Sequence, residues 1–282
     1  MAKYTETATV LGQTSLGAGI YDLTLQTKEI AKAAKAGQFV SVYCNDPSKL
    51  LPRPISLGGI DRQAGTIRLV YRVTGQGTGT EEFSKLKAGD TVRILGPLGN
   101  GFTVEPGKKA FLIGGGIGVP PMLQLAKDIN AEVVQGLGSG TAPYEGCPCG
   151  KPAKPDMQIV MGYRDDNTFL LDEFKEQAES FVSSDNGAVG TRGTVVDAIK
   201  ANGLTADVIY ACGPTPMLRA LKAYAAEHDM ECYISMEERM ACGIGACLAC
   251  VCKTKDKTEH TNVNNARICA DGPVFNAREV EL

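Results

Sequence analysis

Four cysteines near the end of the chain constrain its fold more than any other feature. Cys242, Cys247 and Cys250 stand in the run Cys-Gly-Ile-Gly-Ala-Cys-Leu-Ala-Cys, and Cys269 follows after eighteen intervening residues. This C-x₄-C-x₂-C…C spacing is typical of the plant-type ligands of a [2Fe–2S] cluster. The glycines and alanines between the cysteines allow the backbone to approach the cluster sulfurs. Because such a cluster passes one electron at a time, the pattern predicts an electron carrier.

Zinc binding and disulfide formation are the other roles open to these cysteines. A zinc site favours two C-x₂-C knuckles, and only Cys247 and Cys250 form one. The first residues of the chain lack the apolar segment of a secretory signal, which indicates a reducing cytoplasm and disfavours disulfides. Cys252 lies two residues beyond Cys250 and stays an alternative fourth ligand, with Cys269 preferred.

Composition excludes several classes of function. With 282 residues, the chain is long enough for two domains and a small third unit. Its net charge of −3 offers no basic field for nucleic acid, and no apolar stretch reaches membrane-spanning length. His228 and His260 are the two histidines, and neither lies in a motif, so we do not expect histidine-based acid–base catalysis.

The first hundred residues have the pattern of a closed antiparallel β-barrel. Short segments rich in Val, Ile, Thr and Tyr are separated by Gly, Pro, Asn and Asp, which is typical of strands joined by turns. A Lys- and Ala-rich connection, Ala31–Gly37, interrupts them. The predicted strands are Thr5–Leu11, Tyr21–Thr27, Gln38–Tyr43, Thr66–Val73 and Thr91–Leu95.

Strands and helices alternate from Lys109 onward, which predicts a doubly wound parallel sheet. Further strands are expected at Gln158–Met161 and Asp207–Ala211, and the predicted helices are Leu170–Ser180, Thr194–Asn202 and Pro216–Asp229, the last with Thr215 as its N-cap. The fold class is therefore a multidomain chain with a β-barrel, an α/β domain and a C-terminal cluster subdomain. The expected domains are residues 1–104, 105–231 and 232–282.

Two glycine-containing turns in the α/β region predict a dinucleotide site. Gly114-Gly-Gly-Ile-Gly118 follows a strand and opens a helix, a context in which backbone N–H groups bind pyrophosphate. Ala211-Cys-Gly-Pro214 makes a second strand-to-helix turn in the same sheet, where ligands of such folds bind. Cys212 is either a small buried residue or a group packed beside a nicotinamide ring.

These motifs together resemble a known family. Arg53-Pro-Ile-Ser56, the Gly114–Gly118 turn and Cys212-Gly-Pro214 follow a barrel in the order found in the ferredoxin–NADP⁺ reductase superfamily. The run Met236-Glu-Glu-Arg-Met-Ala-Cys242 and the segment Cys269-Ala-Asp-Gly-Pro273 narrow the resemblance to the PyrK family, the electron-transfer subunits of class 1B dihydroorotate dehydrogenases. The resemblance covers nearly the whole chain.

The resemblance implies three cofactors and a residue set for each. Arg53 would bind the flavin pyrophosphate, with Ser56 near flavin N5. The implied FAD site is Arg53, Pro54, Ile55, Ser56, Tyr71, Arg72, Val73, Gly77 and Thr78. The implied NAD site is Gly114, Gly115, Gly116, Gly118, Cys212, Gly213 and Pro214, and the implied metal ligands are Cys242, Cys247, Cys250 and Cys269. FAD must stand between the other two cofactors, because NAD exchanges hydride and the cluster exchanges single electrons.

The resemblance also implies a partner. Electrons would come from an FMN-containing, dihydroorotate-oxidising catalytic subunit of the PyrD type and reach NAD⁺ through the cluster and FAD, in cytoplasmic pyrimidine biosynthesis. A heterotetramer is implied, although the sequence itself does not distinguish a dimer from a dimer of dimers. Alternative functions are a ferredoxin:NADP⁺ or sulfide-linked reductase subunit, and a non-enzymatic redox sensor.

Two local features lie outside these motifs. Residues 136–156 form a Gly- and Pro-rich insertion with Cys147 and Cys149, either a redox pair, half a metal site or incidental thiols. Asp185 predicts NAD rather than NADP, since an acidic residue near the ribose favours the free 2′-hydroxyl, whereas Arg164 and Arg192 argue for a phosphate.

Overall fold

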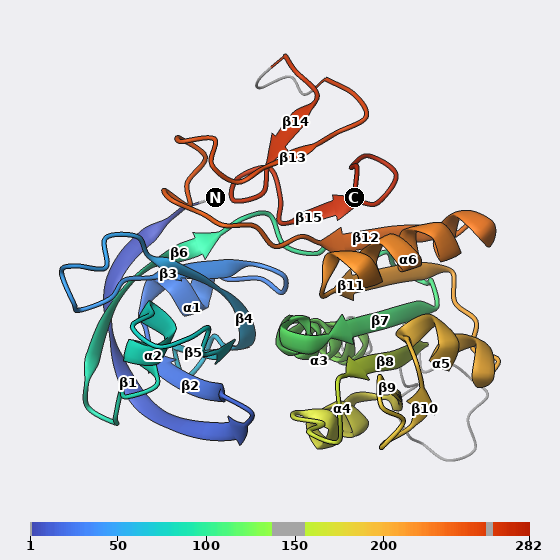
Figure 1. Cartoon of the computed structure of the whole chain (residues 1–282), viewed down its shortest axis with the longest axis horizontal. Coiled ribbons are helices and arrows are strands. Elements are labelled where there is room, and N and C mark those ends of the chain that lie inside the picture. The colour runs from blue at the N-terminus through green and yellow to red at the C-terminus, as the bar shows by residue number, and fades with distance from the viewer. Residues whose placement is uncertain (1, 137–155, 258–261) are drawn as a thin grey trace.

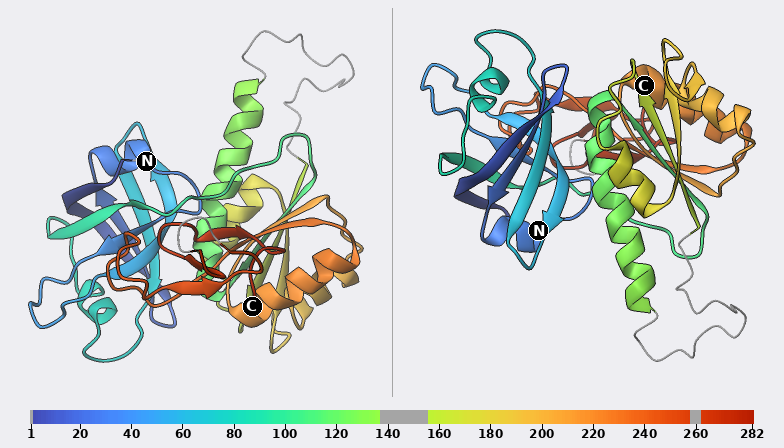
Figure 2. Two further views of the ribbon diagram at one scale, coloured as in Figure 1. Left: turned by 90° about the horizontal axis from the view of Figure 1, so that it is seen from above. Right: turned by 90° about the horizontal axis from the view of Figure 1, so that it is seen from below.

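The computed structural model describes residues 2–136, 156–257 and 262–282. A β-barrel and a three-layered α/β unit lie side by side, and the C-terminal segment crosses above both (Figure 1). Helix α3 runs along the boundary between the two units (Figure 2). Among the described residues, no helix is both long and apolar enough to cross a membrane.

The barrel is closed and antiparallel, with the strand order β1-β2-β5-β4-β3-β6. Side chains alternate between the interior and the surface, and the interior positions carry Leu, Ile and Val. The elements are β1 (Tyr4–Gly17), β2 (Ile20–Gln26), α1 (Glu29–Ala33), β3 (Phe39–Val42), β4 (Arg53–Asp61), β5 (Thr66–Arg72), α2 (Gly79–Phe83) and β6 (Thr91–Leu98).

A seven-stranded sheet forms the second unit, in the order β10-β9-β8-β7-β11-β12-β15. All its strands pair in parallel except β15, which is antiparallel to β12. The elements are β7 (Ala110–Gly115), the 3₁₀ turn η1 (Gly116–Gly118), α3 (Val119–Gly136), β8 (Met157–Tyr163), α4 (Leu171–Gln177), β9 (Glu179–Ser184), β10 (Thr191–Arg192), α5 (Val195–Ala201), β11 (Val208–Cys212), α6 (Thr215–Glu227), β12 (Glu231–Ser235) and β15 (Val274–Asn276).

The C-terminal segment is held to both units. It contains the hairpin β13 (Val251–Lys253) and β14 (Asn265–Arg267). Asn100, just after the last barrel strand, donates its backbone N–H to the Gly272 carbonyl over 2.7 Å, and its side-chain oxygen accepts from the Val274 N–H. The division into domains at 104/105 and 231/232 stays a prediction; β12, which spans the second boundary, and β15 are part of the seven-stranded sheet.

Barrel and sheet meet through buried polar and apolar contacts. The Ile60 N–H of β4 donates to the Gln124 side chain of α3 over 2.6 Å. Arg68 of β5 bridges Asp22 of β2 and Glu173 of α4. These contacts fix the two units against each other, with α3 packed on β4 and the turn η1 that follows β7 packed on β5.

The fold class is as predicted, but several element boundaries were wrong. Strand β4 was missed because Pro52 and Pro54 disfavour a strand, yet Pro54 pairs with Ser41 in an extended backbone. The predicted helix Leu170–Ser180 ends at Gln177, and β9 begins two residues later.

Two further local predictions were also wrong. The N-cap of α6 is Pro214 rather than Thr215, so that the helix begins one residue earlier. The connection predicted over Ala31–Gly37 begins inside the short helix α1. The insertion at 136–156, with Cys147 and Cys149, lies almost wholly outside the described residues.

Candidate functional site

A cavity of about 770 Å³ separates the barrel from the C-terminal segment. Strands β4 and β5 supply one wall, and the chain that follows β12 supplies the other. From the implied flavin set, Arg53, Pro54, Ile55, Ser56, Tyr71 and Arg72 line it. Val73, Gly77 and Thr78 lie outside its lining; Thr78 caps α2 by accepting from the Glu81 N–H.

The walls of this cavity are built for close approach by an elongated ligand. A Cβ at Gly79 would lie 2.6 Å from the Cys44 sulfur and 3.0 Å from the Arg53 Nε, so only glycine leaves the arginine its place. Arg53 lines the cavity and donates to the Leu51 carbonyl, which leaves its remaining N–H groups available to a phosphate. A cation beside a long, partly apolar cavity fits the pyrophosphate and ring system of FAD.

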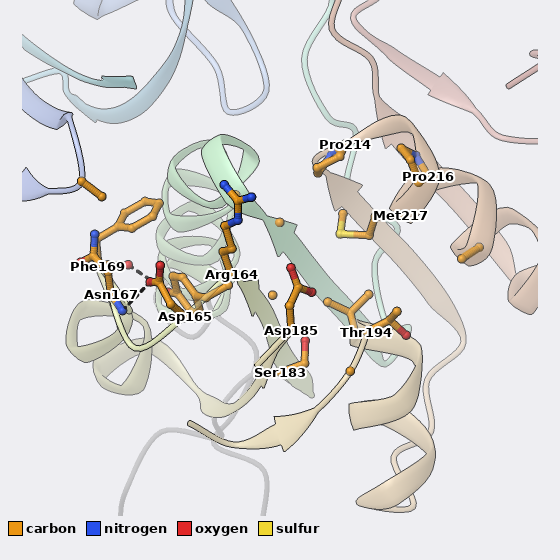
Figure 3. Close-up of a pocket in the computed structure, with 18 of the residues that line it drawn as sticks. Arg164, Asp165, Asn167, Phe169, Ser183, Asp185, Thr194, Pro214, Pro216 and Met217 are labelled. Carbon is orange, nitrogen blue, oxygen red and sulfur yellow. Dashed lines mark hydrogen bonds between the residues drawn. The ribbon is translucent and has the colours of Figure 1, made fainter. Parts of the chain in front are cut away.

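A second cavity, of about 680 Å³, opens at the carboxyl ends of β7, β8, β9 and β11 (Figure 3). From the implied nucleotide set, Gly115, Gly116 and Pro214 line it. The close-up shows Arg164 and Asp185 entering it from the ends of β8 and β9, with Pro214 and Met217 on the opposite wall. The carboxyl edge of a parallel sheet is where ligands of doubly wound folds bind.

The glycine turns of this cavity are in direct backbone contact. A Cβ at Gly118 would overlap with the Cys212 carbonyl, and one at Gly213 would lie 2.5 Å from the Met217 methyl group. A Cβ at Gly114 would come within 2.7 Å of the Met161 sulfur. These glycines are required because the two turns pack directly on neighbouring protein atoms. The cradle expected for a pyrophosphate is the backbone of Gly115 and Gly116, which line the cavity.

Arg72 lines both cavities. Cys212, at the end of β11, is buried and lines neither of them. Burial raises the pKa of its thiol, as does the negative charge of Glu237, while a hydrogen bond with Ser235 opposes the shift. Cys212 is therefore a neutral, close-packed side chain rather than a nucleophile.

The four predicted cluster ligands lie together in two hydrogen-bonded pairs. Cys242 pairs with Cys247, and Cys250 pairs with Cys269, whose thiol also feels the charge of Cys242. Burial opposes ionisation of Cys242, but N–H groups of Ile244, Cys247 and Ala246 and the Cys247 thiol lower its pKa to about 6. Burial and the hydrogen bond with Cys250 raise the pKa of Cys269 to about 12.

This donor set fits a [2Fe–2S] cluster. Backbone N–H groups already point at the Cys242 sulfur, as they would at a bound cluster. Cys252 lies in β13 and accepts from backbone groups that include Ala266. It is buried in the same hydrophobic core as Cys250 and Cys269, but it belongs to neither of the two thiol pairs. Among the described residues, no group of three or more His, Cys, Asp or Glu side chains has the geometry to hold a metal ion.

Sequence reasoning missed parts of both cavities. Met236, Glu237, Glu238, Arg239 and Met240 line the first, and the run lies just ahead of the cluster motif. Asp165 and Thr194 line the second, together with Ala18 from the β1–β2 turn. Arg164, which the sequence had offered as a possible phosphate contact, lines the second cavity as well. Nothing local marks Ala18, which reaches the cavity only because the barrel packs on the sheet.

Comparison with protein families agrees with this geometry. Residues 9–102 match the family model described as the oxidoreductase FAD-binding domain, and residues 237–281 match the iron–sulfur cluster binding domain of dihydroorotate dehydrogenase B. The "NADH-dependent reduced ferredoxin-NADP oxidoreductase", a flavin-based electron-bifurcating protein, is similar with a TM-score of 0.78 and 26% identity, over 98% of this chain and 90% of that chain. A cytochrome P450 reductase from Amycolatopsis shares the fold, with a TM-score of 0.63 and 23% identity over 79% of this chain and 66% of that chain.

These features define a flavin-dependent reductase that also carries an iron–sulfur domain. Relatives that are similar over the whole chain identify the particular family within this class of reductases. The electron transfer subunit of dihydroorotate dehydrogenase B (NAD(+)) from Enterococcus faecalis is 38% identical, with 100% of both chains covered. The subunit of the same name from Listeria monocytogenes is 40% identical over 97% of both chains. The chain belongs to this family of electron transfer subunits.

Proposed function

We propose that the chain carries electrons from a dihydroorotate-oxidising catalytic subunit, FMN-containing and of the PyrD type, to NAD⁺. The observation that carries this proposal is the order of the three sites. The segment after β12 lines the first cavity and leads directly to Cys242, while Arg72 lines both the first cavity and the second. FAD in the first cavity would exchange single electrons with the cluster on one side and hydride with nicotinamide on the other.

The residues of the chain would bind and orient these groups. Arg53 would neutralise the flavin pyrophosphate, and the barrel strand β4 would hold the ring against Ile55 and Ser56. Gly115, Gly116 and Pro214 would hold the nucleotide at the sheet edge, so that the nicotinamide meets the flavin near Arg72 and Cys212. The lining of the two cavities supports Arg53, Pro54, Ile55, Ser56, Tyr71 and Arg72 as FAD contacts and Gly115, Gly116 and Pro214 as NAD contacts. The remaining residues of the predicted sets stay predictions.

The cluster loop is the proposed docking surface for the catalytic subunit. Ile244 and Leu248 are 45% and 51% exposed, which is high for large apolar side chains beside a redox centre. Leu248 has a φ of 56°, a left-handed conformation that a branched residue rarely adopts. An electron that leaves the cluster for a partner would cross this exposed surface.

NAD rather than NADP is the proposed nucleotide. Asp185 follows β9 and lines the second cavity. A carboxylate there would accept from a ribose hydroxyl and repel a 2′-phosphate. Arg164 lines the same cavity, whereas Arg192 is absent from its lining and packs on Gly187.

Co-expression with the catalytic subunit tests the function. The isolated chain should be yellow-brown, be bleached by dithionite and oxidise NADH with ferricyanide as acceptor. The complex should reduce NAD⁺ with dihydroorotate. A colourless chain with stoichiometric zinc, or a coloured chain that does not oxidise NADH, would contradict the proposal. A chain that oxidises NADH but forms no complex would support the reductase role and contradict the proposed catalytic partner.

A further inference from the structure

One arginine is built into the base of the cluster loop. Arg267 ends β14, two residues before Cys269. Its Nη1 donates to the carbonyl of Gly245, in the run between the first two cluster cysteines, over 3.0 Å. Its Nε and Nη2 donate to the two carboxylate oxygens of Asp271 over 3.0 and 2.8 Å. With 13% of its side chain exposed, Arg267 joins the cluster loop to the turn that carries the last ligand.

The backbone of Arg267 belongs to the same structure. Its carbonyl accepts the N–H groups of Ala270 and Asp271 over 3.0 and 2.7 Å, and its own N–H donates to the Asp271 carboxylate over 2.7 Å. The next residue, Ile268, donates its N–H to the Cys250 carbonyl over 2.9 Å. Both ends of the arginine are therefore fixed relative to the cluster cysteines.

The guanidinium of Arg267 lies in close contact with the loop. Gly245 has a φ of 88°, and a Cβ there would lie 3.1 Å from the arginine Nη1 and 2.8 Å from the Ala270 Cβ. The hydrogen bond with Asp271 raises the pKa of Arg267 despite its desolvation, and the charges of Cys269 and Cys250 act in the same direction. Since arginine does not titrate in proteins, this group is a fixed positive charge that interacts with two of the predicted ligands.

We propose that Arg267 is a positioning residue that holds a positive charge beside the cluster and thereby raises the reduction potential of the cluster. The inference rests on the proposed cluster ligands. Each electron from the catalytic subunit adds one negative charge to an anionic set of thiolates and sulfides, and then passes on to FAD. A nearby cation stabilises the reduced form more than the oxidised form. Asp271 fixes the guanidinium but its own charge opposes the effect, so the two residues act in opposite directions.

A redox titration of the isolated holoprotein tests this inference, with the reduced cluster followed by EPR. Arg267→Met should lower the midpoint potential, so that the ratio of reduced to oxidised cluster at a given potential falls roughly tenfold, equivalent to about 59 mV for a one-electron couple. Asp271→Asn should raise the potential, because it removes the opposing charge and leaves the cation. Arg267→Lys keeps the charge and should stay nearer the native value than Arg267→Met.

Two controls separate this effect from a general loosening of the fold. Arg267 does not line the first cavity, so the midpoint potential of the flavin, followed by its visible absorbance, should be unchanged in all three variants. Arg278→Met is the matched control. Arg278 pairs with Asp229 and Glu231 at the start of β12, and its loss should leave the cluster potential as it is.

The sign of the two shifts decides the outcome. A purely structural role predicts shifts in the same direction for Arg267→Met and Asp271→Asn, because both break the same ion pair. Shifts of the same sign, or unchanged potentials, would overturn the inference. If Arg267→Met does not retain iron, a lowered or unchanged potential in Asp271→Asn would still overturn it. Iron and FAD contents and NADH–ferricyanide activity of the native protein test the proposed function separately.

Discussion

Gly118 and Cys212, 94 positions apart in the sequence, are in backbone contact at the sheet edge. A Cβ at Gly118 would overlap with the carbonyl of Cys212 and lie 2.6 Å from the Gly213 nitrogen. Both of these contacts are backbone atoms and not the ends of flexible side chains. A larger residue at position 118 would therefore have to push the two turns apart. The contact thus sets the width of the cradle between the β7 and β11 turns.

Gly118→Ala should therefore damage nucleotide binding while sparing the flavin. Overpacking of this kind costs about 1–3 kcal/mol, which corresponds to roughly a tenfold or greater rise in KM for NADH. The FAD content should stay unchanged, because neither Gly118 nor Cys212 lines the first cavity. Gly12→Ala is the matched control, since a Cβ at Gly12 meets nothing within 4 Å. Steady-state kinetics with ferricyanide would measure both, and an unaltered KM in Gly118→Ala would contradict the cradle.

Asp185→Asn should change the nucleotide preference. Removing the charge weakens the hydrogen bond to the ribose and relieves repulsion of a 2′-phosphate, with Arg164 left to attract it. A charged hydrogen bond contributes about 1.5–3 kcal/mol, so the ratio of kcat/KM for NADH to that for NADPH should fall by roughly 10- to 100-fold.

The control for this change lies in the same cavity. Asp165 accepts the Asn167 N–H over 3.0 Å, so its carboxylate is already used within the loop. Asp165→Asn should keep the native preference. A native protein with comparable kcat/KM for both nucleotides, or a ratio that Asp185→Asn leaves unchanged, would argue against Asp185 as the selecting residue.

Cys247→Ser should lose the cluster, and Cys252→Ser should retain it. Cys247 belongs to the set of four neighbouring thiols, whereas Cys252 is packed in the core and hydrogen-bonded to backbone. Iron and sulfide contents with the visible spectrum would measure the effect. Cys247→Ser should keep NADH–ferricyanide activity and lose electron transfer from the catalytic subunit. Cluster loss in Cys252→Ser with full iron in Cys269→Ser would reassign the fourth ligand.

Ile244→Glu and Leu248→Glu should weaken assembly with the catalytic subunit. Each places a charge on the proposed docking surface, and NADH–ferricyanide activity should be retained because the flavin and nucleotide cavities are untouched. Leu11→Glu is the control, since Leu11 is 48% exposed on barrel strand β1, away from the cluster loop. Gel filtration of the co-expressed pair would measure the complex. Assembly at native strength in both variants would place the docking surface elsewhere.

The sequence predicted those parts of the site whose chemistry is local. The cysteine spacing, the Gly114–Gly118 turn and Arg53 each combine ligand chemistry with a short backbone motif. Glu237 and Ala18 could not be found in this way, because their places depend on packing between segments far apart in the sequence. Likewise strand β4 was not predicted, because Pro54 disfavours a strand locally. The pairing with β3 that makes the segment a strand is a tertiary interaction, which the local sequence does not reveal.

Arg68 and Glu173 join the barrel to the α/β unit, and their removal should destabilise the protein. Arg68 donates to Glu173 over 2.7 and 2.8 Å while also pairing with Asp22. Arg68→Met would leave two carboxylates facing each other, which should cost about 2 kcal/mol of unfolding free energy. Lys85→Met is the control, because the exposed Lys85–Glu81 pair contributes little.

The same pair predicts how stability depends on pH. Hydrogen bonds from Arg68 lower the pKa of Glu173 below its ordinary value of 4.5. The native protein then gains stability from this group above pH 4.5 and loses it as the pH falls through the lowered pKa, because protonation removes the charge that Arg68 binds. Urea unfolding at neutral pH and in the acid range should show a steeper loss in the native protein than in Arg68→Met. Parallel pH profiles would mean that this pair does not stabilise the contact between barrel and sheet.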